Sequence, residues 1–335
     1  MTRNTKVTFN PTKSSTALTA QTGGIYPYGF PFTLNPTMGC FFCCKFCYSP
    51  ISLCKLIKGN RDSFFEEVTV RLGVPEQLDK ELSKYSILPQ HLKRVQINEH
   101  SEYYLPQLFT EIRDQNQPDT LLEILNIFQR HWDNGNKWMP HILTKSPLIL
   151  KHLDKLKEMK EMVQVEISFS TEDENKLRSL EIYTPTIKKR LDTIEKLSKE
   201  GIFVRVMAMP FYGNSNDLNN LKQMAFARGA VAIKNKGLNY YNWQDVVQLS
   251  EAELIDGKLI HSGSRKDTPI NVALNIQSGE PHLISGKTHP MQALMPNHKG
   301  WNALSKLDER LSMVQLDMID CGYAKLNKVD WGYIK

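Results

Sequence analysis

The sequence predicts an α/β fold in which a mainly parallel sheet curves into a partial (β/α)6, TIM-like barrel. Short apolar runs alternate with helix-period segments, and this alternation is typical of parallel strands joined by right-handed helical crossovers. No segment of roughly 20–50 residues repeats, which argues against a solenoid or a propeller. About six or seven strand–helix units favour a curved sheet over an open one. The strand candidates are residues 30–34, 68–70, 94–98, 141–143, 163–169, 202–209 and 230–233.

The helices between these strands are predicted from apolar residues that recur every three or four positions. The segment "PTIKKRLDTIEKLSKEG" shows the pattern clearly, because Pro185 suits a first helical turn and Gly201 suits a C-terminal stop. Similar periods occur in "VPEQLDKELSKY", "DTLLEILNIFQRHW", "SPLILKHLDKLKEM" and "SNDLNNLKQMAFARG". In a barrel of this kind, the side chains that carry chemistry lie at the carboxyl ends of the strands.

Composition divides the chain into three parts. Residues 1–24 are polar and rich in Thr and Ser, and we expect an extended or mobile N-terminal arm there. Residues 25–235 hold the predicted barrel. Residues 236–335 are rich in Gly, Pro, Ser and His and show no helical period, so we expect a C-terminal extension made of loops and short strands.

Charge and hydropathy indicate an ordinary soluble protein with 23% charged and 41% hydrophobic residues. The net charge of +6 is compatible with an anionic substrate or a nucleic acid but selects neither. No apolar stretch reaches the roughly 20 residues of a membrane helix, and no apolar run near the N-terminus is typical of a secretion signal. We therefore expect a cytoplasmic protein with no membrane partner, whose clustered thiols favour metal or redox chemistry over disulfides.

Four of the six cysteines lie in one stretch, "NPTMGCFFCCKFCYSP". Structural zinc usually takes two CxxC knuckles separated by a linker, whereas here the two CxxC units adjoin directly. A thioredoxin-like CxxC fits the spacing but leaves the other cysteines unexplained. Read as CxxxCxxC, Cys40, Cys44 and Cys47 supply three thiolates for a [4Fe–4S] cluster, and the fourth iron stays open for a small-molecule ligand.

The motif "CFFCCKFCY", placed after the first predicted strand, resembles that of the radical S-adenosylmethionine (SAM) superfamily. The resemblance implies a barrel of the radical SAM type, in which the open iron chelates the amino and carboxylate groups of SAM. An electron from the reduced cluster would split the sulfonium bond and give a 5′-deoxyadenosyl radical, so a flavodoxin or ferredoxin-type reductant is implied as a partner. It also implies that Phe46 lies near the adenine and that Cys43 is a variable, non-ligating position.

The resemblance continues over about residues 35–230. The segments "ILTKSPLILKHLDKL", "VQVEISFSTEDENKLRSLE", "PTIKKRLDTIEKLSKEGIFVRVMAMP" and "GNSND" follow one another in an order similar to that of the spore photoproduct lyase-like branch. This branch implies that SAM is bound by side chains at or just after the strand ends. The residues so implied are Glu99, His100, Ser101, Lys145, Ser146, Ser168, Ser170 and Arg178.

Several of these residues have an alternative structural interpretation. Glu99 would pair well with the SAM ammonium, but a loop carboxylate is also often satisfied by backbone N–H groups. Lys145 suits a carboxylate, whereas Ser146 directly before a proline has the form of a helix N-cap. Ser168 and Ser170 share one face of their strand and face either a ligand or a turn. Arg178 on a helix is as often a surface charge as a ligand contact.

The substrate stays open because the sequence departs from the branch near "INEHSEYY", where it has no cysteine to return a hydrogen atom. Tyr103 and Tyr104 are weak candidates for that donor. Two alternatives to a radical SAM enzyme of unknown substrate are kept. One is a lesion-repair lyase acting on nucleic acid, whose binding would fall with salt. The other is a zinc-stabilised binding module with no catalysis, which metal analysis would distinguish.

Overall fold

A computed structural model describes residues 5–20, 32–50, 61–88 and 93–235, together with short strands at 271–274, 283–284 and 287–288. Most of the predicted C-terminal extension, and parts of the predicted N-terminal arm, lie outside these described residues. Among the helices in the described part, none has the length and apolar content that a membrane crossing requires.

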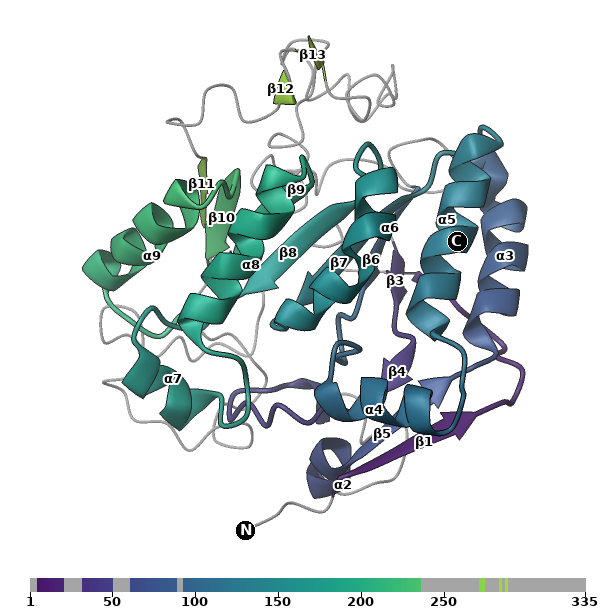
Figure 1. The fold of residues 1–335 in the computed structure, drawn as a ribbon, viewed down its shortest axis with the longest axis horizontal. Coiled ribbons are helices and arrows are strands. Elements are labelled where there is room, and N and C mark those ends of the chain that lie inside the picture. The colour runs from purple at the N-terminus through teal and green to yellow at the C-terminus, as the bar shows by residue number, and fades with distance from the viewer. Residues whose placement is uncertain are drawn as a thin grey trace.

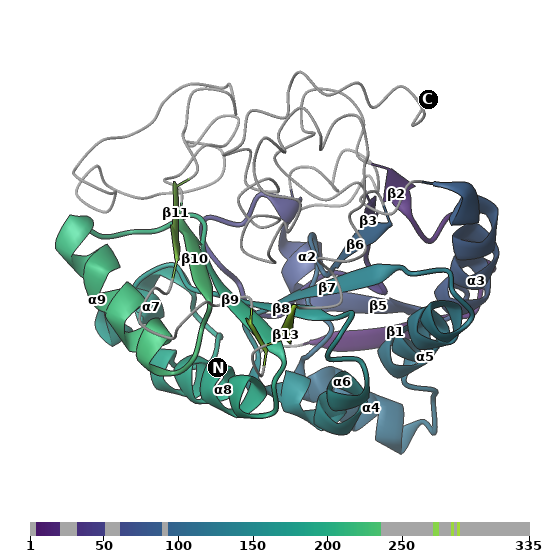
Figure 2. The same ribbon diagram turned by 90° about the horizontal axis from the view of Figure 1, so that it is seen from above.

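The main sheet has eight strands in the order β11-β10-β9-β8-β7-β6-β3-β2. Its six central strands run parallel to one another and follow chain order without reversal. Every crossover therefore turns in the same direction and places its helix on the same face of the sheet, as Figures 1 and 2 show. The prediction of a partial α/β barrel is confirmed. The six strands are β3 (Phe32–Leu34), β6 (Arg94–Ile97), β7 (Met139–Thr144), β8 (Gln164–Ser168), β9 (Phe203–Ala208) and β10 (Ala232–Asn235).

Antiparallel strands close both edges of this sheet. β2 (Thr19–Ala20) pairs with β3 at one edge, and β11 (Asn271–Leu274) pairs with β10 at the other. The residues predicted as an arm and as an appended extension therefore each contribute a strand to the barrel sheet. A separate hairpin joins β12 (Leu283–Ile284) to β13 (Lys287–Thr288).

A second, three-stranded sheet lies beside the barrel. β5 (Glu67–Arg71) pairs in parallel with β1 (Lys6–Asn10) and antiparallel with β4 (Thr37–Met38). The strand predicted at 68–70 exists but belongs to this sheet, so its predicted place in the barrel was wrong. The prediction of an extended or mobile arm also missed a strand. The segment "KVTFN" alternates polar and apolar residues and forms β1, which pairs with β5.

Helices form the outer layer of the barrel, and half of those described begin at a side-chain cap. Asp119, Thr186 and Asn214 accept backbone N–H bonds at the starts of α5, α8 and α9, and Asn214 forms a full capping box with Asp217. The helices are α2 (Arg61–Glu66), α3 (Val74–Lys84), η1 (Tyr85–Ile87), α4 (Pro106–Asp114), α5 (Thr120–Asp133), η3 (Pro147–His152), α6 (Leu153–Glu158), α7 (Glu174–Leu180), α8 (Ile187–Lys199) and α9 (Ser215–Ala227).

The two faces of the barrel sheet differ in polarity. Alternate residues such as Val165 and Val204 are apolar and fully buried, while the residues between them are polar. In the polar set, Glu166 Oε1 lies 2.8 Å from Arg205 Nε and 2.9 Å from Lys234 Nζ. Because the helices cover the other face, these polar side chains line the inside of the barrel.

Candidate functional site

The cysteine loop follows β3 and β4 and lies at the carboxyl end of the parallel sheet, as predicted. Gly39 makes this path available, because its φ of +94° is left-handed and an added Cβ would lie 2.0 Å from Glu67 O. The next residue is tied down as well, since Cys40 N donates to Phe64 O at 2.9 Å. The loop therefore starts from a fixed point against β5.

The structure brings the three predicted ligands together. The Cys44 thiol interacts electrostatically with both Cys40 and Cys47, and Cys40 interacts with Cys47 as well. Burial raises the pKa of Cys40 and Cys44 well above the usual value, and the neighbouring thiols and carboxylates raise it further. Metal ligation, which binds the thiolate, would release these protons. Cys43 instead turns the loop with a φ of 52°.

Within the described residues, no three His, Cys, Asp or Glu side chains converge closely enough to hold a single metal ion. A mononuclear zinc site needs such convergence, because all its ligands bind one centre. An iron–sulfur cube does not, because each thiolate binds a different iron. Cys40, Cys44 and Cys47 are neighbours on one loop, and their ligation of a [4Fe–4S] cluster stays a prediction.

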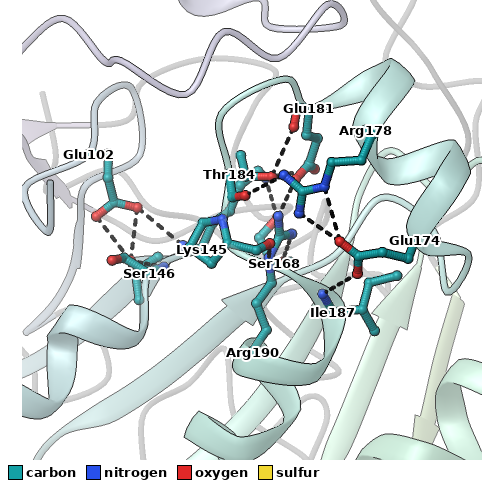
Figure 3. Close-up of polar contacts among 12 residues, drawn as sticks. Glu102, Lys145, Ser146, Ser168, Glu174, Arg178, Glu181, Thr184, Ile187 and Arg190 are labelled. Carbon is teal, nitrogen blue, oxygen red and sulfur yellow. Dashed lines mark hydrogen bonds and ion pairs between the residues drawn. The ribbon is translucent and has the colours of Figure 1, made fainter. Parts of the chain in front are cut away.

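Lys145 lies between Glu102 and Glu181, near the end of β8 (Figure 3). Its Nζ donates to Ser168 Oγ at 2.7 Å and lies 3.5 Å from Glu181 Oε1. The same ammonium lies 5.8 Å from the centre of the Phe46 ring. Three predicted cofactor contacts, on β8, on the cysteine loop and just after β7, are thus neighbours.

Two buried acids near Lys145 were not predicted, and the first is Glu102. Its carboxylate accepts bonds from Thr144 Oγ1 at 2.8 and 2.9 Å, from Lys145 N at 3.1 Å and from Tyr104 N at 2.9 Å. Burial raises the pKa of Glu102, although these bonds oppose the shift. The carboxylate fastens the loop after β6 to the end of β7, and it interacts electrostatically with Cys40.

The second unpredicted acid is Glu181, which pairs with Arg190 at 2.5 Å where both side chains are fully buried. Burial raises the pKa of Glu181, but Arg190 and Lys145 outweigh this effect and lower it to about 2. Glu181 also forms a β-bridge with Cys44, so its backbone holds the cysteine loop. Arg190 Nη1 donates to Ser168 O at 2.8 Å, which ties the pair to β8.

The predicted residues after β6 pack beside the cysteine segment. His100 N donates to Asn35 Oδ1 at 2.9 Å, and the His100 ring lies edge-on to Tyr48. The Glu99 carboxylate lies 3.4 Å from His100 Nε2, while Ser101 Oγ accepts from Thr37 at 3.0 Å. These contacts place all three next to the predicted cofactor site without showing which of them would bind it.

Asn98, at the end of β6, was missed although it is unusual. It is 2% exposed and adopts a φ of 66°, and neither atom of its side-chain amide has a hydrogen-bond partner among the described residues. It directly follows the last residue of β6, and its backbone N–H donates to Leu34 O at 3.0 Å. A buried amide without partners is costly, so Asn98 fits a ligand with polar groups in the barrel mouth.

Other predicted residues have structural roles in the contacts seen. Ser146 accepts from Leu148 N at 3.2 Å and caps η3, which confirms the N-cap interpretation. The Arg178 guanidinium bonds to Glu174 at 2.7 Å and to Thr184 O at 2.8 Å. Ser170 is buried at the end of β8, where its carbonyl accepts from Tyr212 N at 2.6 Å. No contact to a cofactor is assigned to these residues by the geometry.

Tyr103 and Tyr104 face the helical layer. Tyr103 donates to Asp119 Oδ1 at 2.9 Å, and the Tyr104 hydroxyl lies 3.1 Å from His152 Nδ1. His152 Nε2 in turn lies 2.9 Å from Asp119 Oδ2. Both rings are fully buried, and burial together with Asp119 raises the pKa of each tyrosine. The two hydroxyls therefore join α4, α5 and η3, and a role as hydrogen donors stays a prediction.

Comparison with known proteins gives the following matches. The family model of the radical SAM superfamily matches residues 34–225, which is more than half of the chain. An uncharacterised protein, ORF301 of Acidianus two-tailed virus, is 25% identical over 205 residues, or 57% of this chain and 60% of the viral protein.

Among solved structures, spore photoproduct lyase complexed with dinucleoside spore photoproduct is 12% identical, with a TM-score of 0.49 over 66% of this chain and 57% of that one. TYW1 with a lysine-pyruvate adduct is 12% identical, with a TM-score of 0.33 over 67% of each chain. The chain thus spans somewhat more than half the length of the viral relative and of the lyase.

Proposed function

The chain belongs to the radical SAM superfamily, and from this premise we propose that it is a SAM-cleaving enzyme with a [4Fe–4S] cluster on Cys40, Cys44 and Cys47. When bound, the cluster and SAM supply a 5′-deoxyadenosyl radical that removes hydrogen from a substrate. The observation that supports the proposal is that Cys40, Cys44 and Cys47 are neighbours on one loop and that Lys145 lies near two of them, Cys40 and Cys44.

Lys145 is the residue proposed to bind the carboxylate of SAM. Its ammonium already has Ser168 and Glu181 as partners, so its position is fixed before any ligand arrives. Glu181 is balanced by Arg190, and Lys145 therefore keeps charge to offer to a carboxylate. Phe46 lies beneath the same ammonium and against Tyr212, which gives the adenine an aromatic wall in this proposal.

The remaining residues position the loop and exclude water. Glu102 and Glu181 hold the cysteine loop and the strand ends from two sides, and both are fully buried. Asn98 offers a buried, unpartnered amide just after β6. The inner face is polar, with His141 hydrogen-bonded to both Gln164 and Glu166, which favours a substrate that forms hydrogen bonds. We propose no particular substrate, and the lesion-repair lyase stays an alternative on sequence resemblance.

Anaerobic reconstitution tests the proposal. The wild-type chain should bind about four irons and four acid-labile sulfides, and with dithionite and SAM it should release 5′-deoxyadenosine. Cys44→Ala should abolish both. Cys43→Ala is the matched control, because Cys43 neighbours Cys44 in the same loop, and it should keep the iron and the product. Zinc without acid-labile sulfide in the wild type, or equal loss in the two variants, would overturn the proposal.

A further inference from the structure

An apolar pair is exposed beside the cysteine loop. Ile182 is 42% exposed and Tyr183 is 55% exposed. In the described part of the chain, the one other exposed large apolar side chain is Ile87. Scattered exposed apolar residues are ordinary, whereas adjacent ones at a functional loop suggest a contact surface. Ile87 lies on η1, in a different part of the fold, and serves below as a comparison.

The segment 181–184 is bonded directly to the cysteine loop on both sides of Cys43. Tyr183 N donates to Phe42 O at 3.2 Å, and Lys45 N donates to Leu180 O at 2.9 Å. Between these bonds, Glu181 forms a β-bridge with Cys44. Ile182 and Tyr183 therefore lie on a segment that pairs directly with the cysteine loop, at the distance between two neighbouring strands.

An ion pair and hydrogen bonds fix the buried side of this segment, so Ile182 and Tyr183 do not belong to a frayed helix end. Glu181 is fully buried in its ion pair with Arg190. The Thr184 hydroxyl donates to Glu181 Oε2 at 3.0 Å, and Arg178 Nη1 donates to Thr184 O at 2.8 Å. The residues on either side of Ile182 and Tyr183 thus point inward, while the pair itself points to solvent.

Basic side chains outnumber acidic ones in the segments next to the pair. In residues 40–48 and 178–189, every exposed charged side chain is basic, because the acid Glu181 is buried. Two of these cations also have acidic neighbours, since Arg178 pairs with Glu174 and Lys188 pairs with Asp192. The basic side chains are Lys45, Arg178, Lys188 and Lys189.

We propose that Ile182, Tyr183 and this basic rim form the docking surface for an acidic, one-electron donor protein of the flavodoxin or ferredoxin class. The inference rests on the proposed function, because only a reducible cluster needs such a donor. One electron leaves the donor and is gained by the cluster, and no bond forms or breaks at the contact. Redox partners bind through small surfaces, and complementary charges steer the encounter.

The test compares binding and turnover on the reconstituted full-length chain. The double variant Ile182→Ser/Tyr183→Ser should bind oxidised flavodoxin about tenfold more weakly than wild type in biolayer interferometry. Wild-type binding should itself weaken as salt rises from about 50 to about 300 mM, because exposed charges are screened. The matched control is Ile87→Ser, which removes a more exposed isoleucine elsewhere and should bind as wild type.

Two electron sources separate this inference from the proposed function. With reduced flavodoxin, 5′-deoxyadenosine release by the double variant should fall about tenfold, whereas with dithionite it should match the wild type within about twofold. Unchanged flavodoxin binding, equal loss with both reductants, or loss of oligonucleotide affinity in place of flavodoxin affinity would each overturn the docking surface. Failure of the proposed function shows differently, as no product from the wild type with dithionite.

Discussion

The ammonium of Lys145 donates to the hydroxyl of Ser168 at 2.7 Å, which joins the residue after β7 to the last residue of β8. Neighbouring parallel strands place their carboxyl ends side by side, so the two residues meet although 23 positions separate them. The bond fixes a cation near the Cys40 and Cys44 thiols, and the first prediction follows from that position.

Replacing Lys145 with Met should weaken SAM binding without loss of iron. A hydrogen bond to a charged group contributes about 1.5–3 kcal/mol, which corresponds to a roughly 10- to 150-fold rise in the dissociation constant. Equilibrium binding of SAM to the reconstituted protein measures the effect. Lys151→Met is the control, because Lys151 lies over Phe109 in the helical layer. Equal affinity in wild type and Lys145→Met would show that the ammonium does not bind SAM.

The Glu181–Arg190 pair should be worth more to stability than any exposed pair. Arg190→Met leaves a fully buried carboxylate without its main partner and should lower the free energy of unfolding by about 3–5 kcal/mol. Arg178→Met removes a half-exposed partner of Glu174 and should cost about 1 kcal/mol or less. Urea unfolding of the apoprotein measures both. A double variant, Glu181→Gln/Arg190→Met, should recover part of the loss, and a cost for Arg190→Met no larger than for Arg178→Met contradicts the argument.

The fold could be predicted because its strands and helices are strongly patterned. The helix that became α8 was predicted from apolar residues at helical spacing and from Gly201 after its end, and the structure has this helix. It begins at Ile187 with Thr186 as its N-cap, so Pro185 precedes the helix and is not in its first turn. β1 was missed because five residues in a polar arm gain their order from pairing with β5, which lies 61 residues away. Such pairing leaves little trace in local sequence.

The site residues could be predicted where the chemistry requires a fixed spacing in the sequence. They could not be predicted where tertiary contacts decide which of several nearby residues reaches the site. Three cysteines four and three positions apart indicated the cluster loop. Glu99 and Glu102 lie in the same quoted segment, and only the structure shows that Glu102 reaches Thr144 and Lys145. Glu181 ends a quoted segment that shows nothing of its role, because that role depends on an arginine nine residues later.

Acid should destabilise the protein in two steps. Burial, with Arg205 nearby, lowers the pKa of His141 from 6.5 to about 4, so between these values the unfolded chain binds a proton that the folded chain does not. The free energy of unfolding therefore falls as pH falls from about 6.5 to about 4, by roughly 3 kcal/mol for this group. Below about 4.5 the lowered pKa values of Glu166 and Glu181 act in the same direction, because the unfolded carboxylates take up protons first.

Urea unfolding at several pH values measures this dependence. His141→Gln should flatten the slope between pH 6.5 and 4.5, whatever its effect on stability at neutral pH, because the titrating group is gone. The slope below pH 4.5 should persist, since it depends on the two carboxylates. If the wild type were equally stable at pH 6.5 and 4.5, His141 would have to titrate alike in the folded and unfolded chain.

Gly39 should matter for iron binding because it sets the start of the cysteine loop. Gly39→Ala places a Cβ about 2.0 Å from Glu67 O and 3.2 Å from Phe64 O, and both are backbone atoms that cannot move without shifting β5. Gly135→Ala is a matched control, because Gly135 also has a left-handed φ, of +84°, but its Cβ would meet nothing within 4 Å. The control should cost about 1–2 kcal/mol for backbone strain alone, and it should keep its iron. Gly39→Ala should cost more and should lose most of its iron after anaerobic reconstitution. Iron and sulfide analysis beside urea unfolding separates the two effects, and equal iron in both variants would mean that the loop tolerates a displaced start.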